Sequence, residues 1–291
     1  MHRYAHVCIL SMISIVSLIS GCIVPQDDDG RLGVVVTIGP QREMAEALGG
    51  DKVKVTVMVP AGESPHAYAP TPAQLVEVAR SKVYFIVGSG IEFELGHLDD
   101  MQDHNQDLRI RDTSAGIELI EMDEHEGGSG IDPHIWLSPS NAKVMVSNMF
   151  EGLVEVDPGN RETYEANRDA YLRRLDELDS YIRGLLAGRE GSRFLVFHPA
   201  WEYFAKDYGL VELAIEEEGK EPGPAGVAAI IEQARDEGIQ VVFVSPQFSR
   251  SSAQTIADEI GGRVVTVDPL AEEYVANLRE VADTLAEGLS K

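Results

Sequence analysis

The strongest constraint on the fold of this chain is a long amphipathic stretch near its middle, residues 157–187. Apolar and aromatic side chains recur there at intervals of three, four or seven residues, at Tyr164, Tyr171, Leu175, Leu178, Ile182 and Leu185. This spacing puts them on one face of a single α-helix. A helix of about 30 residues is roughly 45 Å long, longer than one small lobe is wide. We therefore expect this helix to connect two lobes.

Short β-branched runs alternate with helical segments on both sides of this stretch. Before it we expect strands at 33–38, 53–59, 83–87 and 108–112, helices at 41–48, 73–80 and 140–156, and a short helix with a loop over 91–107. After it we expect strands at 194–197, 210–215, 241–245 and 264–267, and helices at 200–208, 226–237, 251–260 and 272–289. Alternation of this kind predicts parallel sheets. The predicted fold class is α/β, with two parallel-sheet lobes (32–156 and 189–291) joined by one long rigid helix (157–188).

The first 21 residues have the organisation of an export signal. A weakly positive start precedes the apolar run 7–19, which ends in the sequence Ile-Ser-Gly-Cys at Cys22. Small residues before a cysteine are similar to the lipobox of secreted lipoproteins, and a lipid on Cys22 would anchor the chain without spanning the membrane. The alternative is an uncleaved N-terminal anchor helix. We expect a lipidated Cys22 at the outer face of the cytoplasmic membrane, followed by a polar tether at 22–31.

Cysteine content and charge limit the kinds of site that this chain can build. Cys8 and Cys22 are its only cysteines, so cleavage before Cys22 leaves neither a disulfide nor a free thiolate for metal binding. The formal net charge is −25, from 24 Lys+Arg and 49 Asp+Glu. Such a charge argues against nucleic acid as a partner. We expect a monomer whose binding chemistry comes from His, Asp and Glu.

Three histidines stand beside prolines. His66 and His134 each follow a proline, and His198 precedes one. Proline fixes its own φ and restricts the residue before it, so each imidazole sits on a stiff loop. Ser138 and Pro139 then read as the N-cap and first residue of a helix. One such motif is more simply a loop histidine, but its recurrence favours a metal site.

The expected strands bring these histidines toward a common region. His198 and Asp268 directly follow predicted strands, and His66 lies in the loop after another strand. Ligands of open α/β sheets bind beyond the carboxyl ends of the strands. Three imidazoles and a carboxylate form a tetrahedral set for zinc, while manganese also accepts mixed nitrogen and oxygen ligands. We therefore predict a site between the lobes at His66, His134, His198 and Asp268, for Zn²⁺ or alternatively Mn²⁺.

Other residues compete less strongly for these roles. Glu218 and Glu221 rival Asp268 as the oxygen ligand, although their clustering is more typical of a solvated turn. His125, in the acidic loop 121–130, offers a weak metal contact. The histidines that we expect to be solvated are His97 and His104, and the aromatic residues that we expect in the core are Trp136, Trp201, Tyr203 and Phe204.

Three longer motifs resemble those of the metal-receptor family, cluster A-I, of ABC-importer solute-binding proteins. They are Ser-Pro-His-Ala-Tyr-Ala-Pro-Thr-Pro at 64–72, Asp-Pro-His-Ile-Trp-Leu-Ser at 132–138 and Phe-His-Pro-Ala-Trp-Glu-Tyr-Phe at 197–204. The stretches 243–249 and 267–270 extend the resemblance over nearly all of the chain after the tether. It implies two α/β lobes joined by a rigid helix, with zinc or manganese held between them for delivery to a membrane permease. Carried over by position, His66, His134 and His198 are ligands and Asp268 is the fourth.

The chain also departs from the family pattern. Zinc-type relatives often carry a histidine-rich run before the Asp-Pro-His motif, where this chain has only His125. Ser245 stands where relatives commonly have Glu. Manganese-type relatives usually have Glu at the position of His198, so this histidine favours zinc.

A metal receptor is the first hypothesis for the function, and two other functions remain open. A zinc hydrolase also uses three histidines, but it needs an open position for water and a general base. The sequence has no His-Glu-x-x-His motif, and Asp268 would close the fourth position. A surface adhesin is the third hypothesis, and the sequence carries no separate adhesion module.

Overall fold

The structure, a computed structural model, describes residues 30–121, 130–216 and 222–289 of the chain. The predicted signal, most of the predicted tether with Cys22, most of the acidic loop with His125, and the residues Glu218 and Glu221 lie outside these ranges. Residues 31–291 form one unit of the chain, and the elements below all belong to it. None of the helices in the described ranges combines the length and the apolar character that crossing a bilayer requires.

The N-terminal sheet has four parallel strands in the order β2-β1-β3-β4. They are β1 (Leu32–Val36), β2 (Val53–Val57), β3 (Val83–Ile86) and β4 (Arg109–Asp112). Val34 in the central strand pairs with Val55 on one side and Val83 on the other. A central parallel strand is covered on both faces, which explains its unbroken β-branched sequence. The helices of this half are α1 (Gly39–Gly49), α2 (Pro72–Arg80), α3 (Glu92–His104) and α4 (Pro139–Val156).

The C-terminal sheet repeats this arrangement, with the strand order β6-β5-β7-β8. Its strands are β5 (Arg193–Val196), β6 (Val211–Ala214), β7 (Val241–Val244) and β8 (Arg263–Thr266). Its helices are α6 (Glu202–Tyr208), α7 (Pro224–Asp236) and α8 (Arg250–Glu259). All pairings in both sheets are parallel, which confirms the predicted α/β class with two lobes.

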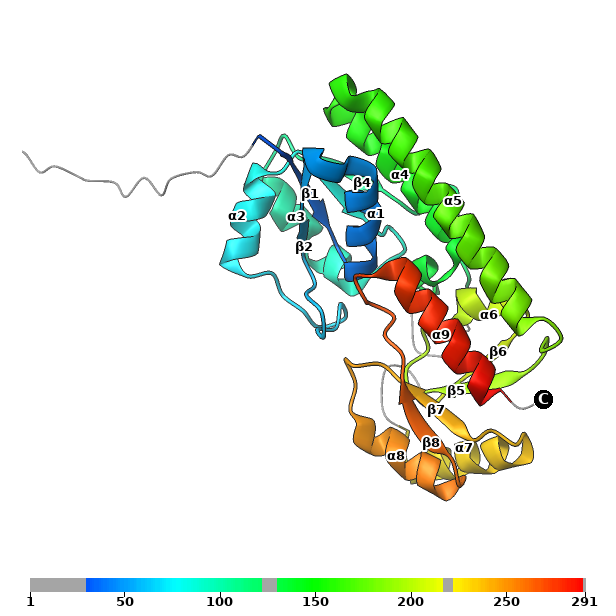
Figure 1. Cartoon of the computed structure of the whole chain (residues 1–291). Coiled ribbons are helices and arrows are strands. Elements are labelled where there is room, and N and C mark those ends of the chain that lie inside the picture. The colour runs from blue at the N-terminus through cyan, green and yellow to red at the C-terminus, as the bar shows by residue number, and fades with distance from the viewer. Residues whose placement is uncertain (1–29, 122–129, 217–221, 290–291) are drawn as a thin grey trace, which may run out of the picture. The chain divides into compact units, whose positions relative to one another are not determined.

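The predicted long helix is α5 (Arg161–Leu186), which has 26 residues. It begins later than expected because Pro158–Asn160 form a separate 3₁₀ turn. Helix α5 packs against α1 and α4 of the first half and against α6 of the second (Figure 1). Its buried face is the one expected from the spacing of apolar residues, except that Leu186 rather than Leu185 is buried at its end.

A second helix, α9 (Tyr274–Gly288), also runs between the two halves, which the sequence did not reveal. It packs along α5 and touches α1 (Figure 1). Just before it, the carbonyl oxygen of Leu270 lies so close to Gly39 that an added Cβ would stand 2.3 Å from it. At its far end, Gly288 lies against Val241 and Phe243 of β7. Two helices, α5 and α9, therefore run between the halves.

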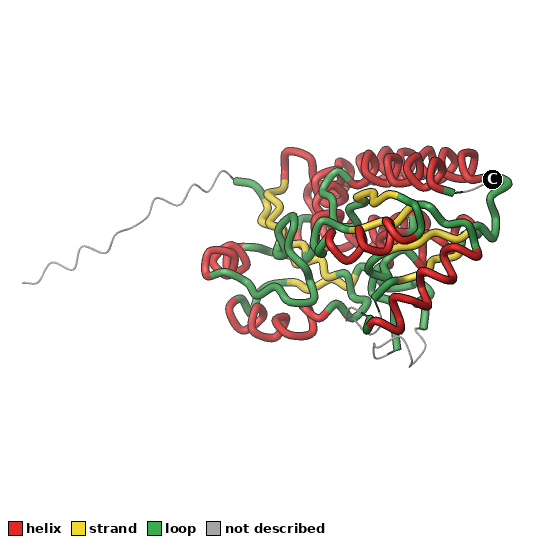
Figure 2. The backbone as a smooth tube through the Cα atoms, turned by 90° about the horizontal axis from the view of Figure 1, so that it is seen from below, coloured by secondary structure: helices red, strands yellow, loops and turns green. Residues whose placement is uncertain are grey.

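The hydrophobic core follows this arrangement. One cluster joins the first sheet, α4, α5 and α9 to the inner face of the second sheet, where it includes Phe194 and Val196. The alternate residues of the same region, Leu195 and Phe197, belong to a smaller cluster with α8. Helices and loops surround the strands in Figure 2. Because the larger core is continuous across both halves, it gives the loops at their edges a shared support.

Candidate metal site

Three of the predicted ligands come together in the structure. One ring nitrogen from each of His66, His134 and His198 lies within 4.8 Å of the other two. The ring centroids are 5.2 Å apart for His66 and His198, 5.4 Å for His134 and His198, and 6.2 Å for His66 and His134. His134 is buried, His198 is partly buried and His66 is exposed. The site therefore has a buried end and an open end.

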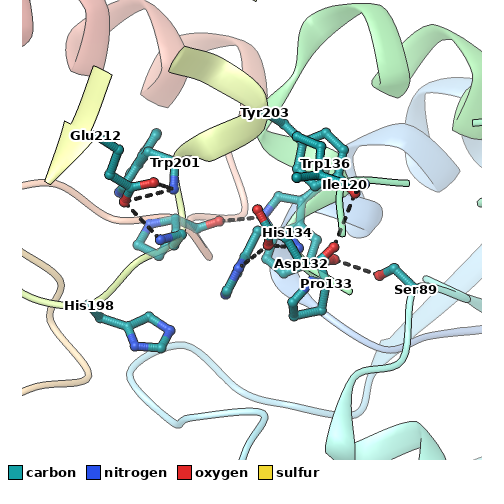
Figure 3. A network of polar contacts seen from close by, with 12 residues as sticks. Ser89, Ile120, Asp132, Pro133, His134, Trp136, His198, Trp201, Tyr203 and Glu212 are labelled. Carbon is teal, nitrogen blue, oxygen red and sulfur yellow. Dashed lines mark hydrogen bonds and ion pairs between the residues drawn. The ribbon is translucent and has the colours of Figure 1, made fainter. Parts of the chain in front are cut away.

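His134 is held by the residue two positions before it. One carboxylate oxygen of Asp132 accepts hydrogen bonds from both the backbone N–H and the ring Nδ1 of His134, at 2.9 and 2.7 Å. The loop is fixed in turn from both halves of the fold. Ser89 donates to the carbonyl oxygen of Pro133, and the hydroxyl of Tyr203 donates to that of Asp132 (Figure 3).

His198 comes from the other half of the fold, at the end of β5 (Figure 3). Its ring Nδ1 lies 2.6 Å from Oε2 of Glu216, a residue that follows β6. The register explains this contact. Val196 pairs with Ala214, so the residues two positions further along each strand lie side by side. On its other side the ring of His198 stacks on Phe248, with centroids 4.6 Å apart and planes inclined by 23°.

His66 lies in the loop between β2 and α2, and its Nδ1 is 2.8 Å from Oε2 of Glu92. The loop turns back through hydrogen bonds from the N–H groups of Ala67 and Tyr68 to the carbonyl oxygen of Ser64. It is tied to the start of α3 because the N–H of Phe93 donates to the carbonyl oxygen of Pro65. The hydrogen bond with His66 lowers the pKa of the Glu92 carboxyl.

The three histidines thus share one arrangement, in which Nδ1 faces a carboxylate. An ionised carboxylate only accepts hydrogen bonds, so each Nδ1 carries a proton, and in the neutral imidazole Nε2 then keeps its lone pair. Carboxylate partners of this kind orient metal-binding histidines and make them better ligands. The arrangement leaves three Nε2 atoms available for a metal ion.

The environment of His198 supports this assignment of the lone pairs. Its Nε2 is buried and has no hydrogen-bond partner among the described residues. Burial is the largest of the effects on the pKa of His198 and lowers it, and the charges of His134 and His66 lower it further. The hydrogen bond with Glu216 acts in the opposite direction and raises it. The ring is therefore disposed to be neutral, which is the state that binds metal.

Asp268 does not belong to the group of converging atoms, unlike the three histidines. It follows β8, and its Oδ1 accepts hydrogen bonds from Nε2 of Gln247 at 3.1 Å and from the N–H of Leu270 at 2.9 Å. Its neighbour Pro269 accepts a hydrogen bond from the indole of Trp136. Asp268 thus lies on a segment that contacts the His134 loop, and both hydrogen bonds that its side chain accepts go to Oδ1.

The remaining sequence candidates divide into three groups. Trp136, Trp201, Tyr203 and Phe204 are core residues, as expected. His104 is exposed and bonds through its ring to the carbonyl oxygen of Asp100, and the ring of His97 packs beside Phe93. The residues that lie outside the described ranges are Cys22, His125, Glu218 and Glu221.

Sequence reasoning missed the carboxylates behind the histidines. Glu216 had a usable signal, because it and His198 both lie two residues past neighbouring parallel strands. The signal for Glu92 was weaker, because this residue begins a helix whose extent the sequence pattern did not define. Asp132 was visible within its motif, but nothing there showed that it holds the ring.

The chain matches the model of a known protein family. Residues 34–288 fit the family described as zinc-uptake complex component A, periplasmic. The manganese-binding lipoprotein MntA of Halalkalibacterium halodurans is 29% identical over 98% of this chain and 99% of its own length. The high-affinity zinc uptake system protein ZnuA of Bacillus subtilis is 28% identical over 89% of this chain and 88% of its own.

Solved structures agree with this assignment. A crystal structure of ZnuA superposes with a TM-score of 0.84 and 38% identity, covering 89% of this chain and 99% of that one. Other relatives are named for iron, so the family does not carry a single metal. The two-lobed fold and the match over residues 34–288 make this chain a member of the zinc-uptake component A family, the metal-binding substrate-binding proteins of ABC importers.

Proposed function

We propose that this protein is the extracytoplasmic zinc receptor of its importer, and that Nε2 atoms of His66, His134 and His198 hold the ion before it passes to a membrane permease. The observation that carries the proposal is the gathering of one ring nitrogen from each histidine within 4.8 Å. Tetrahedral zinc with bonds of about 2.0–2.1 Å would set these nitrogens roughly 3.4 Å apart. A small inward movement of the rings is enough to bind the ion.

The ligand chemistry favours zinc over manganese. Three imidazoles are borderline donors that suit zinc, whereas manganese prefers oxygen ligands and higher coordination. The carboxylates nearest the rings, Asp132, Glu92 and Glu216, are engaged with Nδ1 atoms. A manganese receptor is the second candidate, supported by the name of the Halalkalibacterium relative. Asp268 as fourth ligand stays a prediction.

A hydrolytic enzyme would need a general base beside metal-bound water. The same three carboxylates already accept hydrogen bonds from the imidazoles, which leaves them poorly suited to that task. The family's members are substrate-binding proteins of transporters. We therefore propose that the bound metal is cargo.

For the part of the chain outside the described residues, we propose removal of residues 1–21 and lipidation of Cys22, with 22–31 as a tether. The polypeptide would then act as a monomer at the outer face of the cytoplasmic membrane, with lobes at 32–156 and 189–291 and the linking helix at 157–188. Support comes from the lipobox-like sequence and from relatives that are named lipoproteins.

The test is metal binding by the full chain, extracted from membranes in detergent and purified without added metal. We expect zinc as the retained ion, and competition titrations should rank zinc above manganese. His198→Ala should abolish tight zinc binding, while His104→Ala, in an exposed position, should leave it unchanged. Equal zinc binding by the protein and its His198→Ala variant would reject the proposed site.

A further inference from the structure

Glu94 is a buried carboxylate in the first turn of α3, the helix that meets the His66 loop. Its hydrogen bonds join α3 to the ends of two neighbouring strands. Oε1 accepts the N–H of Val87 at 2.6 Å and the hydroxyl of Thr37, and Oε2 accepts the N–H of Gly88 at 3.0 Å. Glu94 is 5% exposed, so these bonds are shielded from water. They fix the start of α3 to the edge of the first sheet.

The hydroxyl groups beside Glu94 form a continuous buried network with it. The hydroxyl oxygen of Thr37 lies 3.0 Å from that of Tyr84. Because Thr37 gives its proton to Glu94, Tyr84 is the donor in this second bond. Buried networks in which each member has its partners are rigid, and removing one member leaves the others unpaired. Glu94 is the member that connects this network to α3.

The start of α3 supports the loop that carries His66. The N–H of Phe93 donates to the carbonyl oxygen of Pro65 at 3.1 Å, and the carboxylate of Glu92 lies 2.8 Å from Nδ1 of His66. The side chains of Glu92 and His66 are 56% and 31% exposed. Since water competes for a pair this exposed, the pair by itself holds the ring only weakly. The place of the ring therefore depends on where α3 begins.

The loop of His134 is supported differently. The hydroxyl of Tyr203, from the other half of the fold, donates to the carbonyl oxygen of Asp132, and the carboxylate of Asp132 holds the ring of His134. Loss of Glu94 should therefore be felt mainly at His66.

We propose that Glu94 is a positioning residue of the metal site, which places His66 by fixing the start of α3 to the sheet. This inference rests on the proposed function. Glu94 acts through Glu92 and Phe93, the residues that contact the His66 loop. With the exposed ligand held before the ion arrives, binding does not have to order a loop, and the affinity for zinc is higher.

The test is Glu94→Gln, which puts an amide N–H₂ where one carboxylate oxygen accepted a hydrogen bond. The affinity for zinc should fall by about tenfold, the lower end of the range for lost partners behind a ligand. In the metal-free protein, hydrogen exchange should become faster in peptides that contain Phe93, because its N–H holds the His66 loop. Competition titration and mass spectrometry of the full chain measure the two changes.

Asp157→Asn is the matched control. The carboxylate of Asp157 also accepts a buried hydroxyl, that of Tyr164. It follows α4, whose 18 residues separate it from the His134 loop by about 27 Å. This variant should change neither the zinc affinity nor the exchange at Phe93.

A double variant separates positioning from a general loss of stability. His66→Ala removes the ligand through which Glu94 acts, so adding Glu94→Gln to it should lower the zinc affinity no further. An equal loss in both backgrounds would overturn the positioning role, as would unchanged affinity and exchange in Glu94→Gln alone. In either case the proposed function stands if His66→Ala and His198→Ala weaken zinc binding. Zinc binding by His66→Ala equal to that of the original protein would overturn the proposed function and this inference together.

Discussion

The indole nitrogen of Trp136 donates a hydrogen bond of 2.7 Å to the carbonyl oxygen of Pro269. The two residues are far apart in sequence, yet each is close to a candidate ligand, Trp136 to His134 and Pro269 to Asp268. A second bond, from the hydroxyl of Tyr274 to the carbonyl oxygen of Trp136, joins the same loop to the start of α9. The start of α9, the second helix between the lobes, is therefore fastened to the loop that carries His134.

We expect Trp136→Phe to destabilise the protein. The substitution leaves the buried carbonyl of Pro269 without its donor, at a cost of about 1–3 kcal/mol, and adds a small cavity. Denaturant unfolding of the metal-free protein should show a lower midpoint with an unchanged slope. Tyr181→Phe, which removes a partly exposed bond to Asp283, should have a smaller effect because water can replace that partner. Equal effects of the two variants would contradict this ranking.

We expect Glu216→Gln to weaken zinc binding. The amide is a poorer acceptor than the carboxylate for the Nδ1 proton of His198, and loss of such partners typically reduces metal affinity about 10–100-fold. Competition titration against a chelator measures the change. Glu280→Gln, at an exposed position of α9, is the control and should bind as before. If Glu216→Asp restores even part of the zinc affinity, the effect of Glu216→Gln comes from the lost acceptor and not from a general loss of structure.

We expect His198→Glu to shift selectivity toward manganese. The change replaces a borderline nitrogen by a hard oxygen and adds a negative charge. The affinity for zinc should fall by about 10–100-fold, if the effect is at least as large as the loss of a hydrogen-bond partner behind a ligand. The affinity for manganese should fall less, or rise. His104→Glu, on an exposed face, should alter neither affinity. An unchanged zinc-to-manganese ratio would mean that His198 is not a ligand.

Glu212 should make the stability of the metal-free protein depend on pH. Its carboxylate accepts the N–H groups of Ala200 and Trp201, just beyond His198 (Figure 3). Burial is the largest of the effects that raise the pKa of Glu212, and the charges of Asp132 and Glu202 raise it further. The two hydrogen bonds lower it, and the resulting pKa is about 8. The folded state therefore binds more protons than the unfolded state between about pH 4.5 and 8, and stability falls as pH rises through that window.

Replacing Glu212 with Gln isolates this contribution. The variant has no proton to lose there, so its unfolding free energy should decline less between pH 5 and 8 than that of the original protein. Unfolding midpoints measured at several pH values provide the comparison. A parallel decline in both proteins would assign the pH dependence to other groups.

We expect Cys22→Ser to release the protein from the membrane, because lipid on this residue would be its stable anchor. Fractionation of cells that produce each form, followed by detection of the protein in soluble and membrane fractions, measures the outcome. Retention of the Cys22→Ser variant on membranes after signal cleavage would reject lipidation as the anchor.

The sequence alone predicted much of the fold, because most helices and strands can be recognised from local patterns of residues. The β-branched runs, the Gly and Pro stops and the spacing on the face of α5 indicated both sheets and the long helix, because each pattern reflects burial along one element. The Pro-flanked histidines were also recognisable locally. Helix α9 was predicted as a helix, but its course along α5 depends on packing between distant segments, which periodicity does not encode.

The tertiary structure decided what surrounds the candidate ligands. The pairing of Glu216 with His198 depends on the register of β5 with β6, and that of Glu92 with His66 on how one loop meets α3. The sequence placed Asp268 at the end of a strand, but it did not show which groups its carboxylate contacts. Only the fold set Gln247 beside it, because side-chain orientation at a strand end depends on which neighbouring loop offers a donor.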